Sequence, residues 1–574
     1  MRFLLYIVFF GPFHLICQEN KLFIENDSIK YSHRTGGKID SLDMTFSNYL
    51  STFPGGGLNT PNNVFTLALL NNYTGLQNFR NPISFKNMRF SGTPHVGFSY
   101  SFGSKGTQFL HFDYQQAISK NTLLNIEGTR NSSAGFLRNS TYSDNNIQVS
   151  LRKNSKFYSY SLESFYVSKM ISENGGVTDF STIESQGLEF LPVSQGNAKS
   201  IFKNANIKLC NYFNLLNDST AFAGLTTKHQ YEVTSRVYTE TAIYSTWNIS
   251  EYETRDQYRI ASIRNSAGFF TKKKGLYLDL LLQHRFWDYQ NLGIHKDTNE
   301  VNLTSTLQFI KKNFTLKNEL NYNIHGAGGE WSNKSFASTN VGKWNFAGVV
   351  EVEQKWPDQF QRFYYANLTN YKLTNLQLQG RFLSSFTSKY NFSNSTFVQV
   401  SLQSMMLKNN YFFLDNTWRN DTLRTIAINN IIFSGALKIG ILHIQPKISI
   451  TIPSDNFNYI PSSTFNSRIF IKKKMFKAKK MEGVFGTDIS WISSYRLMSY
   501  TSSMDVFSLE NTNMNFNSMM NISAFFGFSL GEFRFYTRVE NVGYFWNNPQ
   551  NQVLIGYPIQ KNFIRLGITW DFFN

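Results

Sequence analysis

Residues 314–324 read Phe314-Thr315-Leu316-Lys317-Asn318-Glu319-Leu320-Asn321-Tyr322-Asn323-Ile324. Apolar and polar side chains alternate through most of this stretch, which is the period of a β-strand whose two faces meet different surroundings. The same alternation recurs in residues 158–163, 301–309, 398–403, 447–452 and 532–539. The sequence therefore predicts an all-β protein with many strands.

The links between these segments alternate in length. Lys311-Lys312-Asn313 joins two of them, Lys153-Asn154-Ser155-Lys156 joins another pair, and Gly531 interrupts the last pair before the C-terminus. Longer polar gaps run from Ser172 to Asn197 and from Gly326 to Asn340. Short links fit antiparallel hairpins, and their alternation with long polar loops is typical of the two rims of an outer-membrane barrel.

The last strand favours a membrane barrel over a soluble sandwich. Its apolar face is formed by Ile564, Leu566, Ile568, Trp570 and Phe572. Alternation alone does not say whether such a face meets a protein core or lipid. The many strands, the export signal described next and this final strand all favour lipid. With about 28 residues for each strand and its connection, the sequence predicts a transmembrane antiparallel β-barrel of roughly 16–18 strands.

The first 17 residues have the features of an export signal. Arg2 supplies the positive charge, residues 3–10 form the apolar stretch, and cleavage is expected after Cys17. A single membrane anchor is the alternative, but the apolar run is about half of the ~20 residues that a helical span requires. Residues 18–81 are expected to form an irregular N-terminal segment and residues 82–574 the barrel. After cleavage Cys210 is the remaining cysteine, so no intramolecular disulfide is expected.

Composition and charge narrow the class of protein. Of 574 residues, 16% are aromatic and 16% are charged, and the mean hydropathy is −0.31. The aromatic content is too high for a disordered chain, and the mean hydropathy is too low for a helical membrane protein. The formal net charge is +18, and the loss of Arg2 with the signal leaves +17. A basic balance is compatible with nucleic acid, an anionic membrane surface or an anion pathway, but export argues against nucleic acid as a partner.

Two regions resemble a known family of barrels. The segment from Tyr557 to Phe573 resembles the closing strand of bacteroidete-type outer-membrane barrels. The region from Gly57-Leu58-Asn59-Thr60-Pro61 to Gly135-Phe136-Leu137-Arg138-Asn139 is similar to the start of the putative porin family. This resemblance implies a multi-pass β-barrel in a gram-negative cell outer membrane that lets solutes pass. It also implies contact with outer-membrane lipid and recognition of the C-terminal strand by the barrel-assembly machinery.

The sequence shows no recognised motif for catalysis, metal binding or cofactor binding. The nine histidines are scattered, and the sequence contains no His-Glu-x-x-His segment, nucleophile elbow or phosphate-binding loop. We therefore expect no enzyme, metal or cofactor. A barrel lipase is a minor alternative, with His229, His284 and His443 as ordinary candidates. The lysine clusters are expected to be solvated hairpin ends, or else contacts for anionic lipid headgroups or anionic solutes. They are Lys272–Lys274, Lys311–Lys312 and Lys472–Lys474 with Lys477, Lys479 and Lys480.

The leading hypothesis is a porin-like channel for passive diffusion of small polar solutes. Its candidate pore-lining residues lie on the polar faces of the strands, and they are Glu163, Glu232, Arg236, Lys317, Glu319, Arg381, Arg534, Arg538 and Arg565. The positive net charge predicts a weak preference for anions. One alternative is a TonB-dependent-type transporter, although the segment before the first clear strand looks short for a folded plug. The other is a secreted soluble β-protein that binds carbohydrate.

Overall fold

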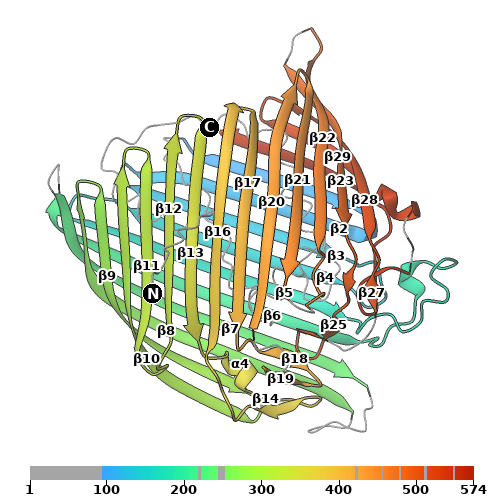
Figure 1. The fold of residues 1–574 in the computed structure, drawn as a ribbon, viewed down its shortest axis with the longest axis horizontal. Helices are drawn as coiled ribbons and strands as arrows, with labels where there is room; N and C mark the ends of the chain where they lie inside the picture. The colour runs from blue at the N-terminus through green and yellow to red at the C-terminus, as the bar shows by residue number, and fades with distance from the viewer. Residues whose placement is uncertain are drawn as a thin grey trace.

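The protein is a closed barrel of 22 antiparallel strands (Figure 1). In this computed structural model, residues 93–573 are described except for 218–220, 243–251, 421–424, 455–456, 478–479, 510–513, 547 and 549. The predicted signal at residues 1–17 and irregular segment at 18–81 lie outside the described residues, as do residues 82–92 of the predicted barrel. Within the described part of the chain, no helix has the length and apolarity that a bilayer crossing requires.

The barrel is a meander in which each strand pairs with the next barrel strand along the chain. The first eleven strands are β1 (His95–Gly103), β2 (Thr107–Ser119), β3 (Thr122–Ser133), β4 (Tyr142–Lys153), β5 (Tyr158–Glu173), β6 (Ala198–Asn217), β7 (Ala221–Thr241), β8 (Glu253–Lys273), β9 (Leu276–Asn291), β10 (Ile294–Lys311) and β11 (Phe314–His325). The other eleven are β12 (Trp331–Val341), β13 (Trp344–Lys355), β16 (Gln379–Ser393), β17 (Thr396–Lys408), β20 (Thr425–Ile439), β21 (Leu442–Pro453), β22 (Ser463–Met475), β23 (Met481–Ile492), β28 (Met519–Leu530), β29 (Phe533–Glu540) and β32 (Phe563–Phe573).

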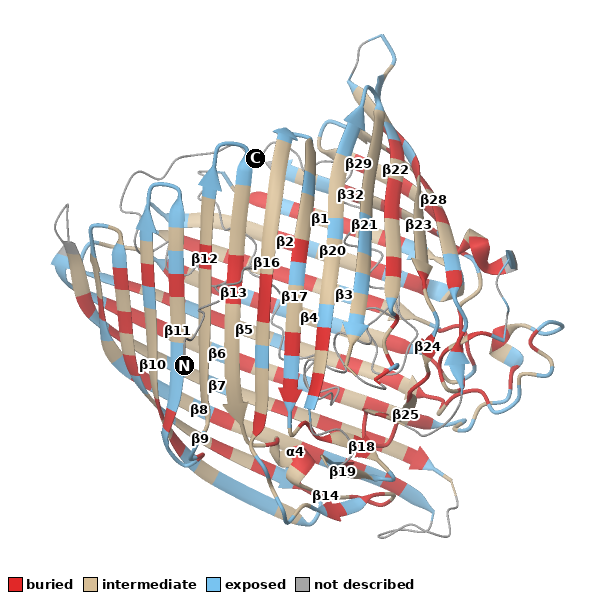
Figure 2. Ribbon diagram, viewed as in Figure 1, coloured by how far each residue is buried: buried red, intermediate tan, exposed pale blue. Residues whose placement is uncertain are grey.

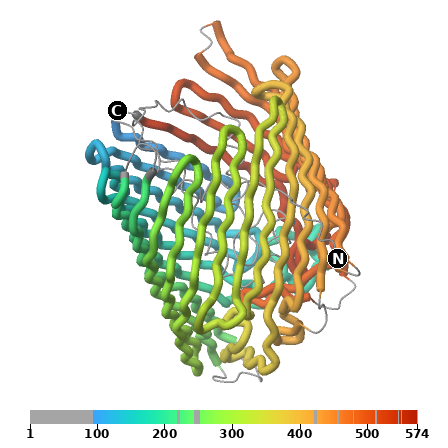
Figure 3. The backbone as a smooth tube through the Cα atoms, turned by 60° about the vertical axis from the view of Figure 1, so that its left-hand side comes forward, coloured from blue at the N-terminus to red at the C-terminus, as the bar shows by residue number. Residues whose placement is uncertain are grey.

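Closure joins the last strand to the first. Strand β32 pairs with β1 in continuous register from His95 opposite Phe573 to Gly103 opposite Arg565. In the ribbon and tube views the red C-terminal strands therefore return beside the blue N-terminal ones (Figure 3). A closed sheet leaves no edge strand with unpaired backbone groups, which is the condition for a sheet in a bilayer.

The predicted barrel is confirmed, but the predicted number of strands is too low. Strands and connections between His95 and Phe573 average about 22 residues rather than 28. Links of two residues account for much of this difference. In one of them Lys274 and Gly275 have φ values of 48° and 84°, as in a type I′ turn, whose twist matches that of the paired strands.

One predicted loop is also wrong. The sequence predicts a long polar connection over residues 326–340, but Trp331–Val341 forms strand β12. It pairs along its length with β11 on one side and β13 on the other. The segment is poor in large apolar side chains, so its hydrogen-bonded neighbours rather than its own alternation define it as a strand. The other predicted long gap is confirmed, since residues 174–197 connect β5 to β6.

The connections divide into two rims. One end of the barrel, here called the turn rim, carries short links such as 120–121, 274–275, 312–313, 440–441 and 531–532. The opposite end, the loop rim, carries the long connections 174–197, 356–378, 409–424, 454–462, 493–518 and 541–562. Because strands of a meander alternate in direction, every second link falls at the same end. The long connections all fall at the loop rim, which also has short links such as 104–106 and 292–293.

Short elements occur within the connections at the loop rim. They are α4 (Gln359–Arg362), β14 (Phe363–Tyr365), β15 (Asn370–Lys372), β18 (Phe412–Leu414), β19 (Thr417–Arg419), β24 (Tyr495–Arg496), β25 (Ser499–Thr501), β26 (Val506–Ser508), β27 (Asn515–Phe516), β30 (Gln552–Leu554) and β31 (Tyr557–Pro558), with 3-10 turns at Ser104–Gly106, Leu188–Phe190 and Val542–Trp546. Figure 1 places α4, β14, β18 and β19 together at the lower end of the view.

Candidate functional site

The two faces of the barrel wall differ in exposure and polarity. On β5, Glu163 is buried while its neighbour Leu162 is 40% exposed. On β32, Thr569 is buried while Trp570 is 45% exposed. Burial alternates in the same way along other strands (Figure 2). We assign the exposed apolar face to the outside of the barrel and the buried polar face to the lumen, because lipid takes the place of water around such a wall.

All nine predicted pore-lining residues lie on barrel strands and on the polar face. Most are paired with an opposite charge on the same or a neighbouring strand. Glu163 contacts Arg152 at 2.7 Å, with both side chains buried, and Glu232 lies 3.7 Å from Arg264. Ion pairs of this kind hold the side chains against the wall, so the lumen surface is built of paired charges.

Three more of the nine form ion pairs on β11, β13 and β16. Lys317 pairs with Glu319, two residues along the same strand. Arg381 on β16 contacts Glu351 and, at 2.9 Å, Glu353 on β13. Both partners of the first pair were predicted from the sequence, while the two glutamates that contact Arg381 were missed.

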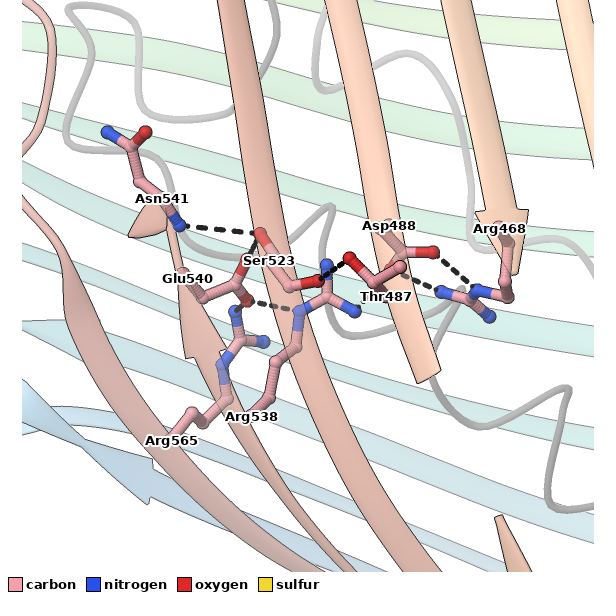
Figure 4. Close-up of polar contacts among 8 residues, drawn as sticks. All are labelled: Arg468, Thr487, Asp488, Ser523, Arg538, Glu540, Asn541 and Arg565. Carbon is pink, nitrogen blue, oxygen red and sulfur yellow. Dashed lines mark hydrogen bonds and ion pairs between the residues drawn. The ribbon is translucent and has the colours of Figure 1, made fainter. Parts of the chain in front are cut away.

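One connected group of charges crosses five consecutive strands (Figure 4). The Asp488 carboxylate on β23 accepts from Arg468 of β22 at 2.7 and 2.9 Å and from Arg538 of β29 at 2.5 Å. Arg538 also lies 3.0 Å from Glu540, which in turn pairs with Arg565 of β32. Three guanidinium groups thus share two carboxylates, so this part of the wall has a formal charge of +1.

A second chain of charges continues around the seam between β32 and β1. Arg534 contacts Asp571 at 3.0 Å. His95 lies between two carboxylates, with Nδ1 3.1 Å from Asp113 and Nε2 3.7 Å from Asp571. His111 on β2 lies 3.6 Å from Asp113. These histidines and aspartates were not predicted. His111 and Asp113 are two residues apart on an amphipathic strand, and this spacing could have placed both on its polar face.

The loops at the loop rim fold together into one structure, here called the loop cap and formed by the described residues of 174–197, 356–378, 409–420, 454–462, 493–518 and 541–562. Buried side chains from separate loops meet in its larger apolar cluster, among them Leu191, Phe457, Met498 and Leu554. Short sheets join the loops as well, since β18 of one loop pairs in parallel with β26 of another. The loops therefore support one another and do not hang independently in solvent.

The loop cap is packed against the inner wall of the barrel. The ring of Tyr258 on β8 packs at a tilt against Phe360 of α4, with ring centroids 5.2 Å apart. Tyr289 of β9 meets Phe363 of β14 at 5.3 Å. Tyr258 and Tyr289 are fully buried and lie on the polar-facing side of their strands. The loops thus turn inward at the loop rim and occupy part of the lumen beside strands β7–β9.

Arg236 on β7 fastens the loop cap to this wall. Its guanidinium donates to the backbone carbonyls of Ser502 and Ser503 and, at 2.8 Å, to the Ser200 hydroxyl. The side chain is 1% exposed and lies 5.3 Å from the Phe202 ring. Arg236 was predicted to line the pore; it points to the lumen side but lies under the segment between β25 and β26.

Hydrogen bonds within the cap extend this anchor. Tyr500 donates to Asp505 at 2.7 Å and lies 3.4 Å from Glu173 at the end of β5. Burial, the largest cause, and the nearby Asp505 charge raise the pKa of the Tyr500 phenol well above its ordinary value. The phenol therefore stays protonated at physiological pH and remains a donor.

The segment Gly135–Asn139, which is part of the family resemblance, ties the loop between β3 and β4 to the loop cap. Gly135 has φ of 81°, and a Cβ at this position would lie 2.0 Å from the Ser140 hydroxyl oxygen. Phe136 is buried in the larger apolar cluster. The Asn139 amide donates to the carbonyls of Glu173 at 2.6 Å and Ala198 at 3.2 Å. The loop between β3 and β4 is thereby tied to both ends of the connection that follows β5.

The three histidines considered for a lipase have other neighbours. His229 contacts Asn265 at 2.9 Å, His284 contacts Asn299 at 3.0 Å, and His443 stacks on Phe470 with ring centroids 4.7 Å apart. Across the described residues, no group of three or more histidine, cysteine or acidic side chains has a geometry that would hold a metal ion.

Comparisons with known proteins agree with this architecture. A family model described as "Putative porin" matches residues 43–574. No curated protein matches the sequence.

Among solved structures, the FrpB iron transporter from Neisseria meningitidis (F5-1 variant) is similar with a TM-score of 0.59 and 10% identity, covering 84% of this chain and 83% of that one. The siderophore receptor PirA from Acinetobacter baumannii also gives 0.59, with 8% identity and coverage of 85% and 81%. The ferric-catecholate import receptor Fiu from E. coli K12 gives 0.59, with 11% identity and coverage of 84% and 82%. At these identities the likeness establishes the fold alone.

Proposed function

Because the chain belongs to the putative porin family, we propose that it is an outer-membrane channel through which small polar solutes diffuse passively. The observation that carries this proposal is the closed 22-strand barrel with an inner wall of ion pairs. Paired charges offer hydrogen bonds to water and polar solutes without holding any one solute tightly. The soluble carbohydrate-binding alternative has no support from this architecture, because the wall exposes apolar side chains outward.

The test is single-channel conductance of the purified, folded, full-length protein in a planar bilayer. Stepwise openings of constant size are the expected result. Liposome swelling with uncharged sugars of increasing size would then measure the limit of the passage. A folded barrel that neither conducts nor admits the smallest sugar would contradict passive diffusion.

The loop cap favours a second candidate, an energised transporter. Its packing on the inner wall of β7–β9 narrows the loop rim, and several structural neighbours are iron transporters or siderophore receptors. An energised transporter would take up its solute in cells only while the inner membrane is energised. A protonophore would therefore abolish uptake in this case and leave passive diffusion unchanged.

A matched pair of variants tests the role of the cap in either candidate. Arg236→Met keeps the length and much of the apolar volume of the side chain but removes its donors. Arg381→Met makes the same change on β16, where the side chain contacts Glu351 and Glu353 rather than the cap. If the cap limits the passage, Arg236→Met will show longer or larger openings and Arg381→Met will not.

A further inference from the structure

Exposed lysines are concentrated at the turn rim. In or within three residues of the short links lie the exposed Lys120, Lys153, Lys156, Lys273, Lys274, Lys311, Lys312, Lys343, Lys438, Lys473, Lys474, Lys477 and Lys480. Among the described residues of the same segments, the acidic side chains are Glu482 and Glu532. One end of the barrel therefore carries a strong positive charge, which the proposed channel function does not by itself explain.

Four of these lysines point to the outside of the barrel. Each continues the exposed apolar row of its own strand at an even spacing. Lys153 follows Val149 on β4, and Lys273 follows Phe269 on β8. Lys311 follows Leu307 on β10, and Lys473 follows Ile471 on β22. The paired register is continuous over each of these stretches, so the spacing fixes the face.

The cross-strand partners agree with this assignment. Lys273 is opposite Leu276, which is 45% exposed, and Lys311 is opposite Phe314, which is 39% exposed. By contrast, Lys472 is opposite the buried Val484 and pairs with Glu482 at 2.8 Å. Lysines of the same rim thus divide into an outward set and an inward set.

The height of the outward set corresponds to lipid headgroups. Each lysine lies two or four residues beyond an exposed apolar side chain, which is about 5–10 Å along the barrel axis for a tilted strand. Exposed aromatic side chains occur at the same level, including Phe157 and Trp344, and aromatic girdles mark the boundary of the apolar band in such barrels. The long lysine side chains reach from this boundary into the phosphate layer.

We propose that Lys153, Lys273, Lys311 and Lys473 form a collar that binds the headgroup phosphates of anionic phospholipids in the leaflet at the turn rim. This inference rests on membrane insertion of the barrel but not on what passes through it. Short turns face the periplasm in outer-membrane barrels, so the leaflet is the inner one. Attraction of anionic solutes to the lumen does not account for these four residues, because their side chains are on the lipid side of the wall.

The test uses full-length protein reconstituted in phosphatidylcholine bilayers that contain either spin-labelled phosphatidylglycerol or spin-labelled phosphatidylcholine. Electron spin resonance measures the fraction of each lipid that is motionally restricted at the barrel perimeter. The wild-type protein should prefer phosphatidylglycerol, and added salt should weaken this preference because it screens exposed charges. The variant K153Q/K273Q/K311Q/K473Q should lower the preference by about twofold or more.

The matched control is K272Q/K438Q/K472Q/K474Q, which removes the same charge from lumen-side positions of the same rim. It should leave the lipid preference unchanged. An equal loss in both variants, or no preference in the wild type, would overturn the collar. The single variants K273Q, from the outward set, and K272Q, from the lumen side, provide the same comparison if the fourfold variant does not fold. If neither labelled lipid is restricted, membrane insertion itself fails, an outcome distinct from insertion without preference.

Discussion

Arginine substitutions along β32 would measure the depth of the outer face in the bilayer. The strand has eleven residues, or about 36 Å along its length and about 28 Å along the barrel axis at a tilt of ~40°. This span matches an apolar band of about 25 Å, so Ile568, the sixth residue, lies near the bilayer midplane. Its cross-strand partners are Tyr100 and Phe535.

We expect Ile568→Arg to lower the free energy of unfolding by about 2–4 kcal/mol, because the charge would be placed in the centre of the apolar band. Ile564→Arg and Phe572→Arg should cost about 0–1 kcal/mol, since these positions lie near the two boundaries. Thr569→Ser is the inner-face control. Its hydroxyl is 3.0 Å from that of Ser99, and serine retains this contact.

The assay is equilibrium folding into phospholipid vesicles, with denaturant titration followed by tryptophan fluorescence. The reasoning predicts a profile with its maximum cost at Ile568. Equal costs at the three outward positions would refute the depth assigned to Ile568. A larger cost for Thr569→Ser than for Ile568→Arg would refute the assigned orientation of the wall.

Three further predictions concern the cap and the lumen. Arg236→Met removes charged hydrogen bonds to two backbone carbonyls, which together are worth about 3 kcal/mol. The population in which residues 502–503 have left the wall should therefore rise roughly a hundredfold. Longer openings in single-channel records would show this rise. The channel should prefer anions, as measured by the reversal potential in a salt gradient. The double variant Arg538→Gln/Arg565→Gln should lower this preference, because it removes two positive charges from the wall. A preference of the wild-type channel for cations would contradict the prediction. Gly135→Ala should destabilise the β3–β4 loop by about 2 kcal/mol, because alanine is strained at φ of 81° and its Cβ would collide with Ser140. Faster cleavage of the loop cap by thermolysin would report this change.

The barrel could be predicted from the sequence because every barrel strand lies between the same two environments. Its outer side chains meet lipid and its inner ones meet polar surroundings, so alternation at residues such as Leu316 to Leu320 records the fold directly. The number of strands could not be obtained in the same way. It depends on the length of the links, and a two-residue link such as Lys274-Gly275 carries no hydrophobic pattern to count.

Strand β12 shows a second limit of alternation. Phe336 and Ala337 are the apolar residues of the segment from Ser332 to Asn340, and two adjacent apolar side chains do not form a periodic row. Hydrogen bonds from β11 and β13 complete the backbone pairing whatever the side chains are. In a closed barrel a weak strand is thus specified by its neighbours, which a single-segment reading does not include.

The candidate site separates what a strand pattern determines from what it leaves open. Glu232 and Arg236 occupy equivalent positions on the same face of β7, and the pattern predicted that face for both. The two residues lie at different heights along the barrel axis. Arg236 is buried and Glu232 is half-buried, because the loop cap covers Arg236. That cap is built from apolar residues more than two hundred positions away, including Met504 and Val506. Period-2 alternation therefore identifies which residues face the lumen, while the packing of distant loops decides which of them a solute can reach.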